Sequence, residues 1–222
     1  MSTRTIELTA ADGHRCSAYL AEPKGSPKGG IVIAQEIFGV NSHIRAVVDG
    51  YAADGYRVIA PALFDRHTRG FETGYGPADI EAGRAIIGQL DFDQVLADVA
   101  AAVAEVQSAG KVAVIGYCWG GTLAWLAAAR LPAVSCAVGY YGGGIPDLLD
   151  EAPARPTLLH FGEKDARPSP ATAAEINRRY PAVKTFIYPA GHGFNCDQRG
   201  SYDAASARLA RERTLAFLAE NL

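Results

Sequence analysis

The chain has 222 residues, of which 49% are hydrophobic and 20% are charged, and its formal net charge is −3 at pH 7. These values are ordinary for a globular protein that can bury a substantial core, and they favour a single domain over residues 1–222. The slightly negative net charge argues against a protein that binds nucleic acid or an anionic membrane, because such proteins carry an excess of basic residues.

The cysteines and the N-terminal residues indicate the cellular compartment. Four cysteines, at positions 16, 118, 136 and 196, are widely spaced, with no CxxC pair and no Cys/His spacing typical of a zinc site. The first residues, MSTRTIELTAADG, lack the apolar segment of a signal peptide. We therefore expect a cytoplasmic protein with reduced thiols and no metal site.

The first part of the chain predicts a hairpin followed by a βαβ unit. Polar and apolar residues alternate in Thr3–Thr9 and Arg15–Ala21, with a turn signal between them, which indicates an antiparallel pair. Two apolar strands then flank a helix that Asn41 or Ser42 can cap. Such a unit predicts parallel strands with a right-handed crossover. These strands are Gly30–Ala34 and Tyr56–Ala60, and the helix ends near Ala53.

The remainder of the chain alternates helices with apolar strands. Leu63–Pro77 has no clear period and predicts a long loop, which in a compact domain often borders a site. The pattern predicts an α/β fold, a mostly parallel central sheet with helices on both faces. The expected helices are Ala78–Leu90, Phe92–Gln107, Ala171–Arg179 and Ala204–Leu218, and the expected strands are Val112–Ile115, Val134–Tyr141, Thr157–Phe161 and Lys184–Tyr188.

The most informative stretch is Lys111–Ala129, KVAVIGYCWGGTLAWLAAA. A β-branched strand leads directly into Gly-Tyr-Cys-Trp-Gly, and an Ala/Leu-rich helix follows, which is the layout of the nucleophile elbow of α/β-hydrolases with cysteine in the nucleophile position. Gly116 and Gly120 fit because a Cβ would collide in so sharp a turn. Cys118 is then expected in a strained conformation at a helix N-terminus, which stabilises a thiolate. The alternative is a small buried apolar residue.

Two later strands each end in a polar candidate for catalysis. Asp165 and His192 follow these strands, and the order nucleophile, acid, histidine is that of α/β-hydrolases. The carboxyl ends of parallel strands meet at one sheet edge, so both residues can approach Cys118. We expect His192 to act as general base and acid and Asp165 to orient it. The alternative to His192 is His160, which is better interpreted as a core histidine. The alternative to Asp165 is Glu163, which lies less far into the loop.

An oxyanion formed by attack on a carbonyl needs preorganised N–H donors. In this architecture one donor is the residue after the nucleophile, here Trp119, and the other comes from the loop after an early strand, where Ile37 is best placed. Their neighbours Tyr117 and Phe38 are further candidates for substrate contacts.

Together these motifs resemble those of the dienelactone hydrolase family, the carboxymethylenebutenolidase-like α/β-hydrolases with a cysteine nucleophile. The resemblance runs nearly end to end and implies hydrolysis of a small ester or lactone through an acyl-cysteine intermediate, without metal or organic cofactor. It also implies a role for Glu36, since the matching glutamate helps to switch the cysteine from resting thiol to reactive thiolate as substrate binds. The motifs are Gln-Glu36-Ile-Phe-Gly-Val-Asn, Gly-Tyr-Cys118-Trp-Gly-Gly, Gly-x-x-Asp165 and Ala-Gly-His192-Gly-Phe.

The sequence departs from the family at the arginines that hold the substrate carboxylate. One of them lies four residues beyond the catalytic histidine, where this chain has Cys196, and another aligns with Ile80. Arg84 and Arg199 are candidates for a shifted clamp, or else ordinary surface charges. Two alternatives therefore stay open: a thiol esterase for neutral esters, and a non-catalytic or redox-sensing protein that uses Cys118 and Cys196. We expect a monomer.

Overall fold

The computed structural model describes all 222 residues, and its elements follow the predicted alternation along the chain. The strands are β1 (Ser2–Thr9), β2 (Arg15–Glu22), β3 (Gly30–Ala34), β4 (Arg57–Pro61), β5 (Val112–Tyr117), β6 (Cys136–Tyr140), β7 (Thr157–Gly162) and β8 (Lys184–Tyr188). The helices are α1 (Ser42–Ala53), α2 (Pro77–Ile87), α3 (Phe92–Val106), α4 (Trp119–Arg130), α5 (Pro170–Arg179) and α6 (Ala204–Asn221).

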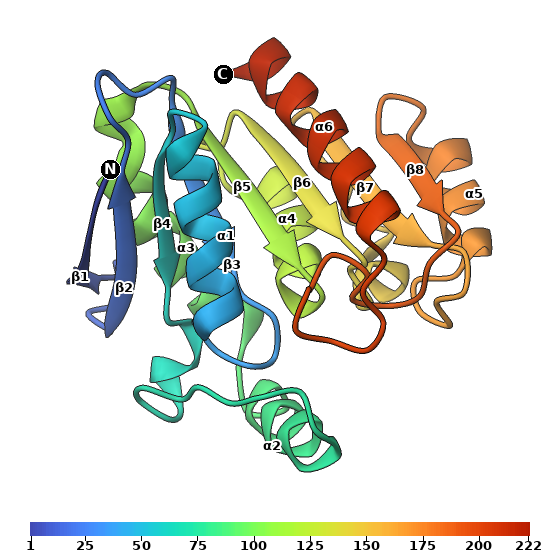
Figure 1. Cartoon of the computed structure of the whole chain (residues 1–222), viewed down its shortest axis with the longest axis horizontal. Helices are drawn as coiled ribbons and strands as arrows, with labels where there is room; N and C mark the ends of the chain where they lie inside the picture. The colour runs from blue at the N-terminus through green and yellow to red at the C-terminus, as the bar shows by residue number, and fades with distance from the viewer.

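The strands form one sheet in the order β1-β2-β4-β3-β5-β6-β7-β8. The hairpin of β1 and β2 is antiparallel and β2 is antiparallel to β4, whereas every pairing from β4 across to β8 is parallel. The predicted hairpin and the predicted mostly parallel sheet are confirmed. The carboxyl ends of the central strands therefore point to one edge (Figure 1).

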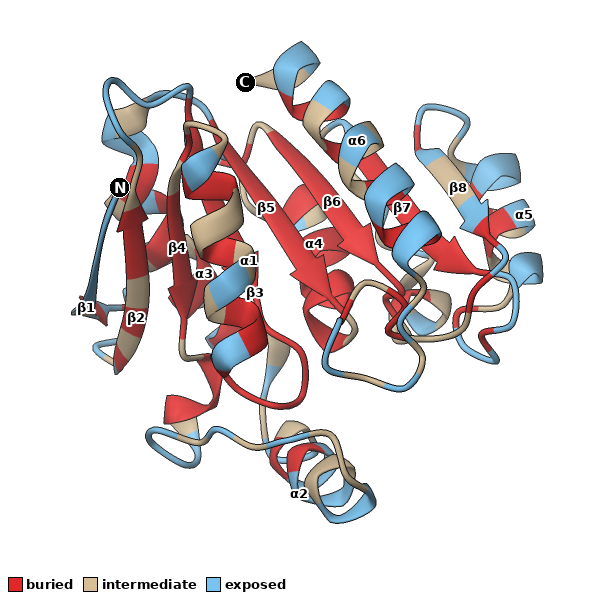
Figure 2. Cartoon of the chain, viewed as in Figure 1, coloured by how far each residue is buried: buried red, intermediate tan, exposed pale blue.

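Helices cover both faces of this sheet, because successive residues of a strand point to opposite sides. In β3, Ile31 and Ile33 pack in the same core layer as α1 and α6, whereas Val32 and Ala34 pack in the layer of α3 and α4. Figure 2 shows the central strands as buried and α2 as largely exposed, beyond the carboxyl ends of the strands. None of the helices has the length and apolar character needed to cross a membrane.

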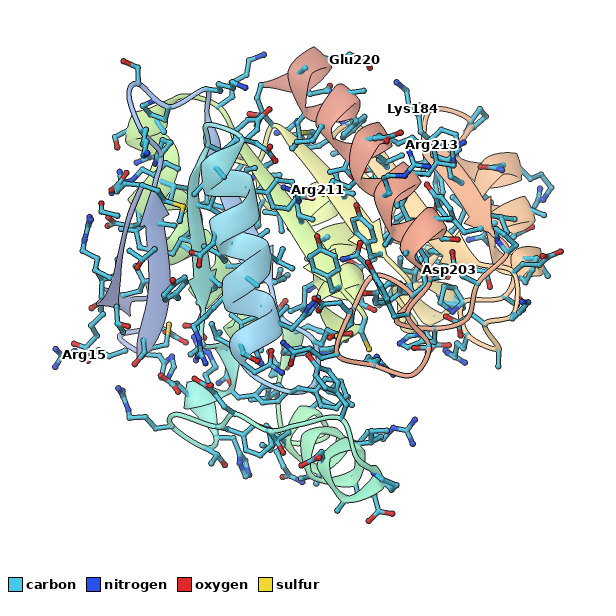
Figure 3. All side chains as sticks on the ribbon, viewed as in Figure 1. Arg15, Lys184, Asp203, Arg211, Arg213 and Glu220 are labelled. Carbon is cyan, nitrogen blue, oxygen red and sulfur yellow. The ribbon has the colours of Figure 1, made fainter.

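Helix α6 is fastened to the sheet and to α1 by charged side chains. Lys184 of β8 forms an ion pair of 2.8 Å with Glu220 near the C-terminal end of α6 (Figure 3). The guanidinium of Arg211 lies 3.8 Å from the ring centre of Tyr51 in α1. These contacts hold α6 against β8 and α1, and the segment that joins β8 to α6 carries several residues of the site described below.

The interpretation of Leu63–Pro77 as a loop requires correction at both ends. Leu63–Arg66 form a 3₁₀ helix, and the last residue of the predicted loop begins α2. The carboxylate of Asp65 accepts hydrogen bonds from the N–H groups of Ser17 at 2.8 Å and Gly70 at 2.7 Å. These bonds hold the turn in a compact form that its irregular sequence pattern does not indicate.

Close backbone approach explains the glycines between β5 and α4. A Cβ on Gly116 would lie 1.8 Å from the carbonyl oxygen of Gly120, and a Cβ on Gly120 would lie 2.1 Å from that of Ala34. Real Cβ contacts are never so short, so both positions require glycine. The steric argument made from the sequence is confirmed.

Replacement of Gly120 tests this packing. We expect Gly120→Ala to lower the free energy of unfolding by at least about 3 kcal/mol, because the methyl group must displace backbone of β3. The matched control is Gly88→Ala, where the nearest atom to a new Cβ is 3.6 Å away, and we expect a change within about 1 kcal/mol. Urea unfolding followed by circular dichroism measures both, and equal stabilities would contradict the close approach.

Candidate active site

Cys118 occupies the turn between the end of β5 and the start of α4. Its φ is 55°, a left-handed conformation that few residues other than glycine adopt, and such strain is concentrated at functional positions. The Cys118 N–H donates to the carbonyl oxygen of Tyr140, and the Cys118 carbonyl accepts from the N–H of Gly121. β5 extends two residues beyond its predicted end because Gly116 and Tyr117 continue the ladder with β6. The thiol is thereby held, partly exposed, at a helix N-terminus.

Cys118, His192 and Asp165 form one continuous chain of contacts. The Nε2 atom of His192 lies 3.1 Å from Cys118 Sγ, and its Nδ1 atom lies 2.7 Å from Asp165 Oδ2. Asp165 is buried, and its other oxygen accepts the N–H of Arg167 at 2.9 Å, which fixes the carboxylate. Burial lowers the pKa of His192, but hydrogen bonds to Asp165 and Cys118 outweigh it and raise this pKa to about 10. Both contacts thus stabilise the imidazolium, the form that His192 takes once it carries a second proton.

The two alternatives to this pair lie elsewhere. His160 is completely buried and hydrogen-bonds Tyr188 at 2.8 Å and Thr214 at 3.0 Å. Burial lowers the pKa of His160 to about 3, so its imidazole is neutral, as expected of a core histidine. Glu163 is exposed and makes no hydrogen bond to His192.

Two backbone N–H groups beside Cys118 have no acceptor in the protein. They are those of Ile37 and Trp119, and the side chains of both residues line the same cavity as Cys118. The loop that carries Ile37 is held by Gln35, whose Oε1 accepts the N–H of Leu63 at 3.2 Å. Helix α2 packs so closely against this loop that a Cβ on Gly83 would lie 2.1 Å from the Ile37 carbonyl oxygen.

The cavity over Cys118 has a volume of about 710 Å³, which suits a small molecule. It combines apolar side chains from α2 and α3 with three arginines, Arg84, Arg167 and Arg199. Phe38 lies in the wall of this cavity, whereas Tyr117 does not. Tyr117 is buried on the far side of β5 against Tyr140, with ring centres 4.6 Å apart, so it is removed from the candidate substrate contacts.

Glu36 lies buried beside the cavity and is paired with Arg199. Its Oε1 atom accepts from the guanidinium of Arg199 at 3.2 Å, while its Oε2 atom is buried without a hydrogen-bond partner. The guanidinium also stands 5.5 Å from the ring centre of Phe38 and 5.9 Å from that of Tyr75. Arg199 is therefore held in the cavity wall by Glu36 and is not an ordinary surface charge.

The sheet order and the turn that carries Cys118 define the class of this protein as an α/β-hydrolase. The sequence profile of the dienelactone hydrolase family matches residues 16–222, and the chain belongs to that family. It is 37% identical to a carboxymethylenebutenolidase of Pseudomonas putida over 99% of this chain and 97% of that protein. Carboxymethylenebutenolidase 1 of Cupriavidus pinatubonensis is 33% identical over 96% of this chain and 95% of that protein.

Solved structures agree with this assignment. A protein of Klebsiella pneumoniae that carries the name of a dienelactone hydrolase has a TM-score of 0.85 and 30% identity, with 99% of both chains covered. A dienelactone hydrolase-like promiscuous phosphotriesterase from metagenomic libraries has a TM-score of 0.80 at 20% identity, over 100% of this chain and 99% of that one, and so shares the fold. The chain is accordingly a hydrolase.

Sequence reasoning missed Arg167 as part of the cavity. Its Nε donates to the carbonyl oxygen of Gly143 at 2.7 Å, which draws the side chain across the loop after β6. Its position two residues beyond Asp165 was the available signal, because residues next to a candidate site residue share its loop.

Proposed function

We propose that this protein hydrolyses a carboxylic ester or lactone through a covalent acyl-cysteine intermediate on Cys118. The observation that carries the proposal is the unbroken series of contacts from Asp165 through His192 to Cys118, at 2.7 and 3.1 Å. Nucleophile, base and orienting acid within hydrogen-bond reach are the signature of covalent catalysis. The relatives named carboxymethylenebutenolidase support the choice of an ester or lactone substrate.

In the first half of the reaction, His192 accepts the proton of Cys118, and the thiolate attacks the substrate carbonyl carbon. Negative charge develops on the carbonyl oxygen, which the free N–H groups of Ile37 and Trp119 are placed to bind. The C–O bond then breaks, and the leaving alkoxide takes the proton from His192. Asp165 stabilises the imidazolium throughout and holds its tautomer.

In the second half, water is the nucleophile. His192 removes a proton from it, hydroxide adds to the thioester carbonyl, and the carboxylic acid leaves as the C–S bond breaks. The Cys118 thiolate regains its proton, and the site returns to its starting state. No step requires a metal or an organic cofactor.

Mass spectrometry can detect the intermediate directly. A slowly deacylating p-nitrophenyl ester, mixed with the enzyme and quenched in acid, should leave one acyl group on the peptide that contains Cys118. The three buried cysteines, Cys16, Cys136 and Cys196, provide the internal control and should stay unmodified. A burst of p-nitrophenol without an adduct on Cys118 would refute the proposed nucleophile.

We propose that Glu36 regulates the thiol and that Arg199 links this regulation to the substrate. Glu36 and an anionic substrate group compete for the same guanidinium, because Arg199 both pairs with Glu36 and lines the cavity. A bound carboxylate would thus release Glu36 to act on Cys118. The reduced state of all four cysteines fits action in the cytoplasm, and we propose a monomer that acts as one domain on a small molecule.

Replacement of Arg84 tests whether the substrate carries a carboxylate. This exposed arginine lines the cavity and forms no ion pair, so it is available to a ligand. We expect Arg84→Gln to raise KM for a carboxylated dienelactone about tenfold, the effect of one charge-assisted hydrogen bond, and to leave KM for a neutral p-nitrophenyl ester unchanged. The matched control is Arg208→Gln, which removes an exposed arginine of α6.

The same comparison separates the two substrate classes. If the wild-type enzyme turns over only the neutral ester, the arginines do not form a carboxylate clamp, and the neutral-ester alternative is correct.

A further inference from the structure

Three buried side chains beside the proposed active site converge from distant parts of the chain. Glu36 follows β3, His43 lies in the first turn of α1, and Cys196 lies in the segment between β8 and α6. Their ligating atoms, one from each residue, all lie within 4.8 Å of one another. We propose that Glu36, His43 and Cys196 form a binding site for a thiophilic divalent cation, with Zn²⁺ as the best match.

The hydrogen bonding of this cluster points to an external ligand. Glu36 Oε2 and His43 Nε2 are both buried and have no hydrogen-bond partner. The side chain of Glu36 is 1% exposed and that of His43 is 5% exposed, so water does not satisfy these atoms from bulk solvent. Buried polar atoms without partners are rare and costly. A cation bound between them would satisfy both.

The imidazole of His43 is already oriented for metal binding. Its Nδ1 atom lies 3.2 Å from Asp197 Oδ1, which leaves Nε2 as the free ring nitrogen. A histidine that ligates a metal usually donates its other N–H to a carboxylate, and this bond fixes both the tautomer and the ring. Asp197 supplies that carboxylate from the residue next to Cys196, so one short segment carries a ligand and a positioning residue.

The three types of ligand and their total charge favour zinc. Carboxylate, imidazole and thiolate are all zinc ligands, and three protein ligands leave a fourth tetrahedral position for water. Cys196 would bind the cation as its thiolate, so the thiol proton leaves to solvent as the S–metal bond forms. The charges of Glu36 and the Cys196 thiolate then neutralise the divalent cation. The other carboxylate oxygen of Glu36 keeps its bond to Arg199.

A second cluster of similar composition does not have these properties. His14, Cys16 and Asp98 also bring ligating atoms within 4.8 Å of one another. However, Arg66 donates to both oxygens of Asp98, at 2.7 and 2.9 Å, and His14 binds one of them at 3.1 Å. This carboxylate is fully used in ion pairs. Cys16 therefore offers a matched control, a buried thiol in a cluster that should bind no metal.

The test uses Co²⁺ as a spectroscopic probe in the Cys118→Ala background, which removes the proposed nucleophile as a competing thiol ligand. Titration should give a thiolate-to-cobalt charge-transfer band that saturates at one cobalt per chain and disappears when Zn²⁺ is added. The band should be lost in Cys118→Ala/Cys196→Ser and kept in Cys118→Ala/Cys16→Ser. Absence of the band in Cys118→Ala, or its persistence without Cys196, would overturn the site.

Asp197→Asn provides a second variant that does not disturb the core, because the Asp197 side chain is 66% exposed. We expect it to weaken Zn²⁺ binding roughly 10- to 100-fold, measured by competition with a chromogenic chelator in the Cys118→Ala background. Unchanged affinity would show that Asp197 does not position His43 for a metal. These measurements involve no hydrolysis, so their outcome is independent of the proposed function.

Discussion

Replacement of Cys118 by alanine should abolish hydrolysis while the protein stays folded. We expect kcat/KM for any ester substrate to fall by at least about 10⁴-fold, because no other group can form the covalent intermediate. The fold should persist, since alanine removes only the Sγ atom and leaves the backbone bonds to Tyr140 and Gly121 in place. Steady-state kinetics and urea unfolding measure the two effects.

Cys136→Ala is the matched control for this variant. Cys136 is a buried thiol at the start of β6 and has no part in the proposed mechanism, so its loss should cost stability and leave kcat/KM within about twofold. Hydrolysis that survives in Cys118→Ala would exclude the thiol mechanism. Loss of activity in both variants alike would indicate a structural effect.

Replacement of Asp165 by asparagine should lower kcat by roughly 10²- to 10⁴-fold, because the amide no longer stabilises the imidazolium of His192 or its productive tautomer. It should also change the pH dependence. Asp165 is one of the groups that raise the pKa of His192 to about 10, so its loss must move this pKa downward. In the proposed mechanism the imidazolium protonates the leaving group, so activity should be lost as pH rises through this pKa, and the alkaline limb should shift to lower pH.

The pH profile of kcat/KM measures this shift, and Asp150→Asn is the control. Asp150 is exposed and pairs with Arg179 at 2.9 Å, away from the cavity, so its replacement should leave the alkaline limb in place. An Asp165→Asn enzyme with low kcat and an unshifted limb would mean that Asp165 acts on His192 without stabilising its charge.

Local patterns in the sequence were sufficient to predict the mostly parallel sheet and the proximity of Cys118, Asp165 and His192 at one edge of it. The glycines at 116 and 120 report a steric requirement of the turn itself, and parallel strands bring their carboxyl ends to one edge whatever lies between them. Asp165 and His192 therefore meet beside Cys118 although 27 residues separate them. Their chemical roles remain predictions until the variants are measured.

Features that depend on the packing of distant segments could not be predicted in the same way. The side on which Tyr117 lies follows from the true length of β5, because a strand alternates its side chains. Glu36, His43 and Cys196 lie close together although they belong to three separate segments of the chain. No local pattern in the sequence predicts this contact. The pairing of Arg199 with Glu36 likewise depends on the course of the segment between β8 and α6.

The position of α2 keeps part of the cavity wall apart from the residues of the proposed triad. This helix stands beyond the strand ends (Figure 1) and gives the cavity Ile80, Arg84 and Ile87. Cys118, Asp165 and His192 lie just after β5, β7 and β8. Replacement of the three α2 side chains should therefore change which compounds the cavity admits without altering the contacts of Cys118 and Asp165 with His192. Gly83 is the exception, because its close approach to the Ile37 carbonyl couples the helix to the loop that carries a proposed oxyanion donor. A larger side chain at position 83 should therefore disturb the Ile37 loop, whereas Arg84 and Ile87 can be exchanged without this clash.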